Sequence, residues 1–228
     1  MNRTLIAALR SVVAAKPAED IDHKFELAVS DWINDDQDSL EEFASRHPEY
    51  LDQVDKGMEY QPLYRAVLLN TNLFLRLVGS GLTEYRIYPS AFESWTTDQT
   101  VASGWNKYVG SKWDVCSVVF KKSIPEKDRV VCLPCMDSDH KWARDEKEVV
   151  TKVQKKTAKD IDIISIRLPY RFKGEVPEFS EPGKQGQDSS WQEVSLKDAV
   201  YWAENYEALA KEAKDKGMIF SWKPKGVK

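Results

Sequence analysis

The chain has 228 residues, of which 42% are hydrophobic and 31% are charged. At about 150 residues per domain, this length predicts one large domain or one domain with an appendage, and it excludes a mini-protein that needs disulfides or metals to fold. The composition also excludes a disordered chain. Because 33 basic residues stand against 37 acidic ones, giving a net charge of −4, nucleic-acid binding is not expected as the main activity.

Cysteine usage and hydropathy bear on the compartment. Three cysteines are an odd number for a disulfide framework, which favours a reducing compartment. No apolar run reaches the length of about 18 residues that a membrane span needs. Near the start, Arg10 divides the apolar stretch 5–13, whose helical spacing favours an amphipathic helix over a signal peptide. We therefore expect a cytoplasmic protein without a membrane partner.

Residues 1–58 are predicted to form a helical segment. Apolar residues recur every three or four positions between Ile21 and Ile33, which indicates one helix. Pro48 interrupts the next stretch, so we expect a short helix before it, from residue 38 or 39, and another after it, ending near Val54.

From residue 59 to 170 the pattern changes to that of a β core. Short apolar runs rich in Val, Ile and Tyr are separated by turn residues, as is typical of strands in a mainly antiparallel sheet. The expected strands are Leu63–Leu69, Tyr85–Tyr88, Val115–Phe120, Arg129–Leu133, Val149–Val153 and Ile161–Leu168.

The last part of the chain is predicted as a loop followed by a helix. Residues 171–190 are rich in Gly, Pro and charged residues, which indicates a long loop. In the segment 191–228, Ser195 caps a helix with Asp198 at the capping-box position, and Gly217 ends it. The apolar stripe of this helix is Ala199, Ala203, Tyr206, Ala210 and Ala213. The order of elements predicts an α+β fold, one compact domain with appendages.

Three short segments carry residues that suggest chemistry. Arg65 lies inside a predicted strand, either facing outward and paired with a surface carboxylate or directing its planar guanidinium at a phosphate. Ser94 and Thr96 alternate to one face of another strand, and Thr97 or Asp98 is placed to cap the helix that follows.

The third segment contains two glutamates. In an extended conformation Glu146 and Glu148 point the same way while Lys147 points away. Two carboxylates on one face repel each other unless a cationic group lies beside them. The alternative is a charged strand edge that prevents aggregation.

Together, the three segments resemble the arginine-specific class of ADP-ribosyltransferases. That family carries an arginine on an early strand, a Ser-x-Ser or Ser-x-Thr strand leading into a helix, and a Glu-x-Glu before a late strand, and Arg65, Ser94–Thr96 and Glu146–Glu148 follow this order. The resemblance covers roughly residues 60–168 and implies N-terminal helices packed on a mainly antiparallel split β-sheet core, with a C-terminal helix. The run from Ser94 to Asp98 also resembles bacterial and phage-encoded members, including those that modify host RNA polymerase.

The resemblance implies a mono-ADP-ribosyltransferase, an enzyme of the glycosyltransferase class. Its substrate would be NAD, it would use no metal, and its acceptor would be an arginine of a target protein, a host protein in the host cytoplasm if the chain is phage-encoded. A nucleic-acid acceptor stays open. The alternatives are an NAD glycohydrolase with the same site and a non-catalytic protein that binds a host factor.

The family's binding residues transfer to five positions. Arg65 would bind the NAD diphosphate and the nicotinamide ribose, and Ala66 stands where the family usually has glycine. Ser94 would hold the catalytic glutamate in place, and Thr96 would support the nicotinamide pocket. Trp95 occupies the middle position of the Ser-x-Thr pattern.

The two glutamates would carry the catalysis. By resemblance, Glu148 would bind the 2′-hydroxyl of the nicotinamide ribose and stabilise the oxocarbenium-like transition state. Glu146 would orient the acceptor guanidinium and take its proton.

Other patterns favour ordinary structural roles. Cys132 and Cys135 have the spacing of zinc ligands, and Cys116 and His140 would complete four. Small core cysteines are the favoured interpretation, and no helix signal begins at Cys132 to suggest a thioredoxin-type redox pair. The Asp-Ser-Asp run at residues 137–139 is more typical of a turn than of a metal-dependent sugar transferase.

Overall fold

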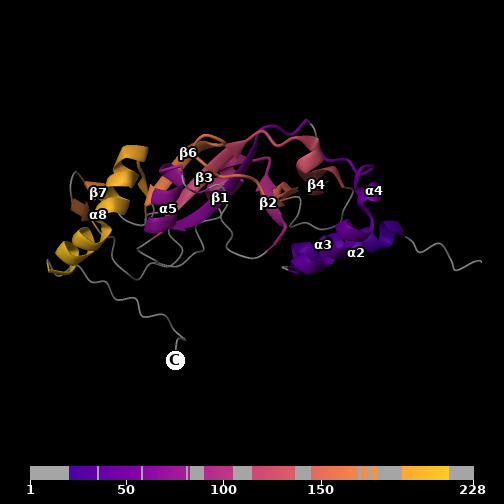
Figure 1. Cartoon of the computed structure of the whole chain (residues 1–228), viewed down its shortest axis with the longest axis horizontal. Coiled ribbons are helices and arrows are strands. Elements are labelled where there is room, and N and C mark those ends of the chain that lie inside the picture. Colours follow the sequence, from indigo (N-terminus) through magenta and orange to yellow (C-terminus); the bar gives the residue numbers. More distant parts are fainter. Residues whose placement is uncertain are drawn as a thin grey trace, which may run out of the picture. The chain divides into compact units, whose positions relative to one another are not determined.

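The structure is a computed structural model that describes residues 21–34, 36–57, 59–80, 82, 90–104, 115–136, 145–168, 171–173, 176–178 and 192–215. The chain divides into two compact units, Met1–Val54 and Asp55–Lys228 (Figure 1). Within the described ranges, no helix combines the length and the apolar character that a bilayer crossing requires.

The described part of the first unit is helical, as the sequence predicts. Phe25 of the first helix stacks on Phe43 and on Tyr50, each at 5.3 Å between ring centroids, and these rings hold the helices together. The Asp36 side chain accepts a hydrogen bond from the backbone of Asp38, so the second helix begins slightly earlier than expected. The helices are α2 (Ile21–Ile33), α3 (Gln37–Arg46) and α4 (Pro48–Leu51).

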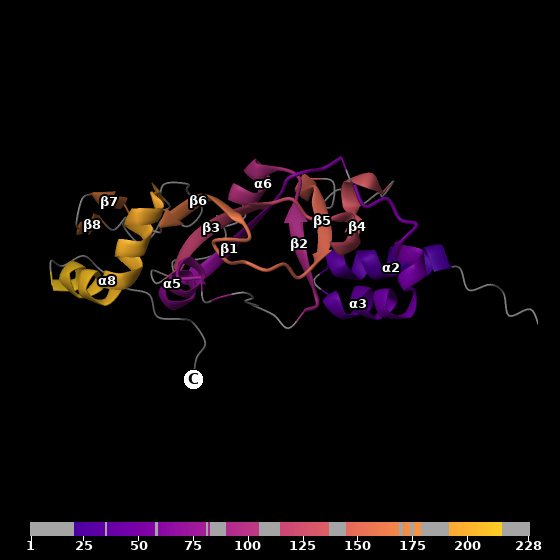
Figure 2. The same cartoon turned by 45° about the horizontal axis from the view of Figure 1, so that its top comes forward.

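The second unit is built on a seven-stranded sheet with the order β4-β5-β2-β1-β3-β6-β9, in which every pair of neighbours is antiparallel (Figure 2). This confirms the mainly antiparallel sheet; the predicted strand Tyr85–Tyr88 lies outside the described residues. The strands are β1 (Leu63–Asn70), β2 (Phe92–Thr96), β3 (Val115–Lys122), β4 (Arg129–Cys132), β5 (Glu148–Lys152), β6 (Asp162–Leu168) and β9 (Gln192–Glu193).

The sheet consists of two halves that meet between β1 and β2. On one side, β1 pairs with β3 along its whole length, from Leu63 to Asn70. On the other side, the register of β1 with β2 is the single pair Tyr64↔Thr96. The halves β4-β5-β2 and β1-β3-β6-β9 are therefore joined at one register position, and Figure 2 shows them side by side.

One face of the sheet is covered by α5 (Thr71–Val78) and α8 (Leu196–Asp215), which pack against each other. The sequence did not predict α5. Asn70 ends β1 and caps this helix, because its side chain accepts a hydrogen bond of 2.9 Å from the backbone of Leu73. Phe74 and Leu77, three positions apart, then bury one helical face in the core.

The predicted capping box of α8 is confirmed. The backbone N–H of Asp198 donates to Ser195 Oγ at 3.1 Å, and the Ser195 hydroxyl donates to Asp198 Oδ2 at 2.6 Å. The predicted apolar stripe is confirmed only in part, because larger side chains between the alanines also fill the core. The predicted end of the helix at Gly217 lies outside the described residues. Among the side chains of α8 that the structure describes, the buried ones are Ala199, Trp202, Ala203 and Leu209.

The prediction of a loop over residues 171–190 was wrong for residues 171–173 and 176–178, which form strands. Strands β7 (Arg171–Lys173) and β8 (Val176–Glu178) pair antiparallel there as a separate two-stranded sheet. A glycine between two very short β runs is as typical of a hairpin as of a loop, so the composition did not separate the two.

We expect Leu77→Ala to lower the free energy of unfolding by about 2–5 kcal/mol, because the fully buried side chain leaves a cavity between α5 and the sheet. The exposed neighbour Arg76 supplies the control: Arg76→Ala should change the free energy by no more than about 0.5 kcal/mol. Urea denaturation of the two variants measures both values. Equal effects would contradict the packing of α5 described here.

Candidate functional site

The structure brings the three predicted segments together on neighbouring strands. Arg65 is on β1, Ser94–Thr96 is on β2, and Glu148 opens β5, in the sheet order β5-β2-β1. Thr96 lies directly opposite Glu148 on one side and opposite Tyr64 on the other. Segments that are far apart in the sequence therefore converge at one end of β2.

Thr96 ties the end of β2 to the turn before β5. Its hydroxyl donates to the backbone carbonyl of Glu146 at 2.8 Å and accepts from the backbone of Asp98 at 3.1 Å. The backbone N–H of Thr97 also donates to the carbonyl of Lys147, at 3.0 Å. The hydroxyl at position 96 thus holds the backbone that precedes Glu148.

Asp98 caps the helix that follows β2, as the sequence predicted. Its Oδ1 accepts from the backbone of Thr100 at 2.7 Å, at the start of α6 (Gln99–Gly104). Its Oδ2 pairs with Lys147 Nζ at 2.7 Å. The hydrogen bond from Lys147 is the main reason why the pKa of Asp98 lies below its ordinary value.

The prediction of an extended Glu146-Lys147-Glu148 segment was wrong. Residues 145–146 are helical, Lys147 has a φ of 49°, and β5 begins only at Glu148. This left-handed conformation at Lys147 redirects the chain, so strand alternation does not place the two glutamates on one face. Glu146 is half-buried and Glu148 is buried.

Ser94, Thr96 and Glu148 share one face of the sheet. Directly paired residues of antiparallel strands project to the same side, and Thr96 pairs with Glu148. Ser94 lies two residues before Thr96 and pairs with Val150, so it belongs to the same face. The resemblance had implied that Ser94 and Thr96 lie close to Glu148.

Arg65 leaves β1 on the other face. Arg65 pairs with Phe120 of β3, which is fully buried in the core. Its neighbour Ala66 pairs with Val119 and lies on the same face of the sheet as Thr96. The Arg65 side chain is 24% exposed, its Nε lies 3.7 Å from Glu93 Oε2, and its Nη1 donates to the backbone carbonyl of Ser94. It therefore crosses the junction between the two half-sheets. The interpretation of Arg65 as an outward-facing residue paired with a surface carboxylate is wrong, because the carboxylate beside it is buried.

Glu93 is the residue of this region that the sequence analysis missed. Its side chain is buried, and Oε1 accepts from the indole of Trp95 at 3.0 Å and from the backbone of Gln154 at 2.9 Å. Oε2 pairs with the ammonium of Lys156, which is also buried, and lies beside Arg65. A carboxylate at a core-facing strand position is the signal that would have identified it.

Trp95 belongs to the core rather than to an open surface. Its side chain is 1% exposed and its indole N–H points to Glu93. Of the residues predicted to bind the cofactor, Arg65, Ala66, Ser94, Trp95 and Thr96 all lie within the described residues.

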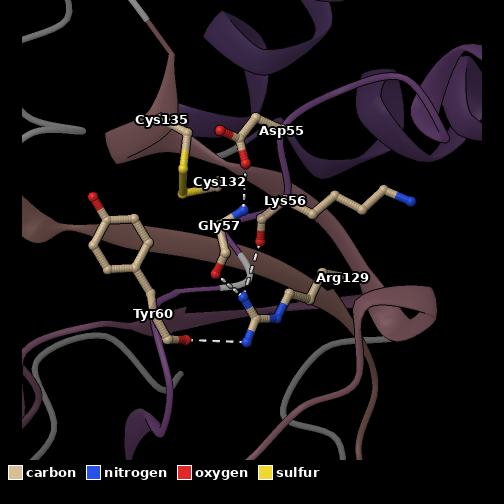
Figure 3. Close-up of a disulfide and its surroundings, with 7 residues drawn as sticks. All are labelled: Asp55, Lys56, Gly57, Tyr60, Arg129, Cys132 and Cys135. Atoms are coloured by element: carbon tan, nitrogen blue, oxygen red, sulfur yellow. Dashed lines mark hydrogen bonds between the residues drawn. A yellow bond between two sulfur atoms is a disulfide. The ribbon is translucent and has the colours of Figure 1, made fainter.

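The cysteines pair in a way that the sequence analysis did not predict. Cys132 and Cys135 form a disulfide across the short helix η3 (Leu133–Cys135), which brings their Cα atoms to 5.3 Å (Figure 3). Cys116 does not join them: it is a free thiol in the core, where burial raises its pKa, and it pairs in register with Leu69. A zinc site that includes Cys116 is therefore not formed, and His140 lies outside the described residues.

Comparisons with protein-family models, with curated proteins and with solved structures give no match for this chain. The resemblance to ADP-ribosyltransferases thus depends on the three motif segments alone.

We expect Glu93→Gln to lower the free energy of unfolding by about 3–5 kcal/mol, because it removes the carboxylate from a buried ion pair. Adding Lys156→Met should recover much of that loss, since the second charge is then removed as well. Lys147→Met, which breaks an exposed pair, is the control and should cost about 1 kcal/mol or less. Urea denaturation compares the variants, and a loss as small as that of the control would contradict the role given to Glu93.

The Asp98–Lys147 pair predicts a pH dependence. Because the pKa of Asp98 is lower in the folded protein than its ordinary value of 3.8, the carboxylate stabilises the fold above that value, and the contribution is lost as the pH falls through the folded pKa. The stability difference between the wild type and Asp98→Asn should be constant above about pH 5 and shrink in more acidic solution. In a Lys147→Met background most of this pH dependence should disappear.

Proposed function

We propose that this protein is a mono-ADP-ribosyltransferase that cleaves NAD, releases nicotinamide and transfers ADP-ribose to an arginine of a target protein. The observation that carries the proposal is the convergence of the three motif segments on the adjacent strands β5, β2 and β1, with Thr96 opposite Glu148. Motifs that matched the family by chance would have no reason to occupy neighbouring strands.

The proposed reaction uses the face shared by Ser94, Thr96 and Glu148. The bond between C1′ of the nicotinamide ribose and the nicotinamide nitrogen breaks, and its electron pair leaves with nicotinamide. The Glu148 carboxylate stabilises the positive charge that develops on the ribose. The acceptor guanidinium then bonds to C1′ and gives its proton to Glu146, whose backbone carbonyl is held by Thr96.

Arg65 would bind the diphosphate from the junction of the half-sheets. Its buried Nε makes no hydrogen bond to any residue that the structure describes, and Glu93 lies beside it to orient the guanidinium. Arg65 and Glu148 leave the sheet on opposite faces, so variants at the two positions test their proposed roles separately. The planar fork of arginine suits a diphosphate better than lysine does, so Arg65→Lys is expected to raise the KM for NAD.

The test is incubation of the purified chain with labelled NAD and a cell lysate, with Glu148→Gln alongside. We expect label on a protein band with the wild type and a loss of about 100-fold or more with the variant, because the charge that stabilises the transition state is gone. Glu126→Gln removes an exposed carboxylate on the short helix η2 (Glu126–Asp128) and should retain full activity. Undiminished transfer by Glu148→Gln would contradict the proposal.

Glu146→Gln separates transfer from hydrolysis. If Glu146 takes the proton of the acceptor, this variant loses transfer to protein while it still releases nicotinamide from NAD. Free ADP-ribose without labelled protein in the wild type would instead identify an NAD glycohydrolase. No turnover of NAD by the wild type, together with capture of a partner that survives Glu148→Gln, would identify a binding protein.

A further inference from the structure

Side chains that could hold a metal ion lie beside the disulfide, away from the face of β2 that carries Ser94 and Thr96. Carboxylate oxygens of Asp55 and Glu59 and the sulfur of Cys135 all lie within 4.8 Å of one another. The sulfur of Cys132, a fully buried residue, is bonded to that of Cys135 and so lies next to this group. Asp55 and Glu59 are exposed and Cys135 is half-buried, so an ion can reach the group from solvent.

Arg129 holds the two segments of this group together. Its buried guanidinium donates to the backbone carbonyls of Lys56, Gly57 and Tyr60 (Figure 3). Its Nε donates to the backbone carbonyl of Ile124 at 3.0 Å. These bonds attach the segment that carries Asp55 and Glu59 to the strand that leads into Cys132. The carboxylates therefore stay beside the sulfurs when the bond between the sulfurs is opened.

Gly57 allows the close approach. It has a φ of 60°, and a Cβ atom at this position would lie 2.7 Å from the sulfur of Cys132 and 3.1 Å from that of Cys135. Its backbone N–H donates to Asp55 Oδ1 at 2.8 Å, which holds that carboxylate beside the sulfurs (Figure 3). A side chain at this position would clash with the sulfur atoms, so the backbone can lie this close to the disulfide only with glycine here.

Four donors of this kind match the preferences of zinc. Zn²⁺ is bound tetrahedrally by thiolates at about 2.3 Å and by carboxylate oxygens at about 2.0–2.2 Å. Ligand atoms of one such site are therefore less than about 4.5 Å apart, so the donors of Asp55, Glu59 and Cys135, already within 4.8 Å of one another, need only small side-chain rotations. The positive charge of Arg129 beside the group offsets part of the negative charge of two thiolates and two carboxylates.

We propose that the reduced chain binds Zn²⁺ through Cys132, Cys135, Asp55 and Glu59, and that the disulfide and the metal exclude each other. A dithiol reductant supplies two electrons and two protons, the sulfur–sulfur bond breaks, and the reductant becomes a disulfide. Each thiol then loses its proton as the sulfur bonds to the metal. The inference does not depend on the proposed transferase activity.

The test is a titration of the metal-free, full-length chain with Co²⁺, which reports its ligands by absorption. The protein reduced with a phosphine should bind one Co²⁺ per chain, with thiolate charge-transfer and tetrahedral ligand-field bands, and one equivalent of Zn²⁺ should remove them. The oxidised protein should show neither band. Absence of these bands in the reduced protein would overturn the proposal.

Two variants test the ligands individually. Cys135→Ser should lose the charge-transfer band, and the double variant Asp55→Asn/Glu59→Gln should bind at least about 10-fold more weakly, the loss that even an outer-shell change can cause. Because these carboxylates are exposed, the double variant is expected to fold, which circular dichroism checks. The double variant Glu204→Gln/Glu207→Gln, which changes two exposed carboxylates of α8, is the matched control and should bind as the wild type does. Unchanged affinity of the double variant would show that the carboxylates are not ligands and overturn the proposed site.

Discussion

The carboxylate of Glu93 is buried in the core face of β2, and the arrangement of the candidate site depends on how its charge is balanced. A buried carboxylate destabilises a fold unless cations and hydrogen bonds surround it. Lys156, which follows β5, and Arg65, on β1, provide the cations, and Trp95 and Gln154 provide hydrogen bonds. One charge therefore ties together the three strands on which the motif segments lie.

This constraint gives Arg65 a particular position. Between β1 and β2 the backbone register is limited to one pair, and the guanidinium of Arg65 bonds to the Ser94 carbonyl close to that pair. The cationic group is thus built into the junction of the half-sheets, with Glu93 on one side of it. The hydroxyls of Ser94 and Thr96 and the carboxylate of Glu148 occupy the opposite face, so the proposed reaction centre and the proposed diphosphate contact are separated by β2 itself.

Arg129, at the start of β4, is a second buried charged residue in the half-sheet β4-β5-β2. Arg129 is balanced mainly by four backbone carbonyls, and burial lowers its pKa while Glu126 and Glu59 raise it. Through these bonds it holds Lys56, Gly57 and Tyr60 close to β4, whose last residue, Cys132, pairs with Val149, the residue next to Glu148. The disulfide region and the candidate catalytic strand are thus neighbours in one sheet, although their chemistry is distinct.

Local patterns in the sequence determined much of the secondary structure. Alternation and β-branched residues predicted β1, β3, β4, β5 and β6 to within a residue or two at each end. The capping box of α8 could be predicted because its two partners, Ser195 and Asp198, are only three residues apart. The motif order also predicted that Ser94, Thr96 and Glu148 belong together. Helix α5 was missed because its start depends on Asn70, a residue that reads equally well as the end of a strand.

Only the tertiary structure decided the partners of the charged and sulfur-containing residues. Arg65 and Lys156 meet Glu93 because β1, β2 and β5 are neighbours, and no local periodicity encodes strand order. The left-handed conformation of Lys147 and the pairing of Cys132 with Cys135 likewise follow from packing around them, since the same short sequences are compatible with an extended strand and with two free thiols. Elements are specified by interactions within a few residues, whereas a buried charge is placed by groups that only the folded chain brings within reach.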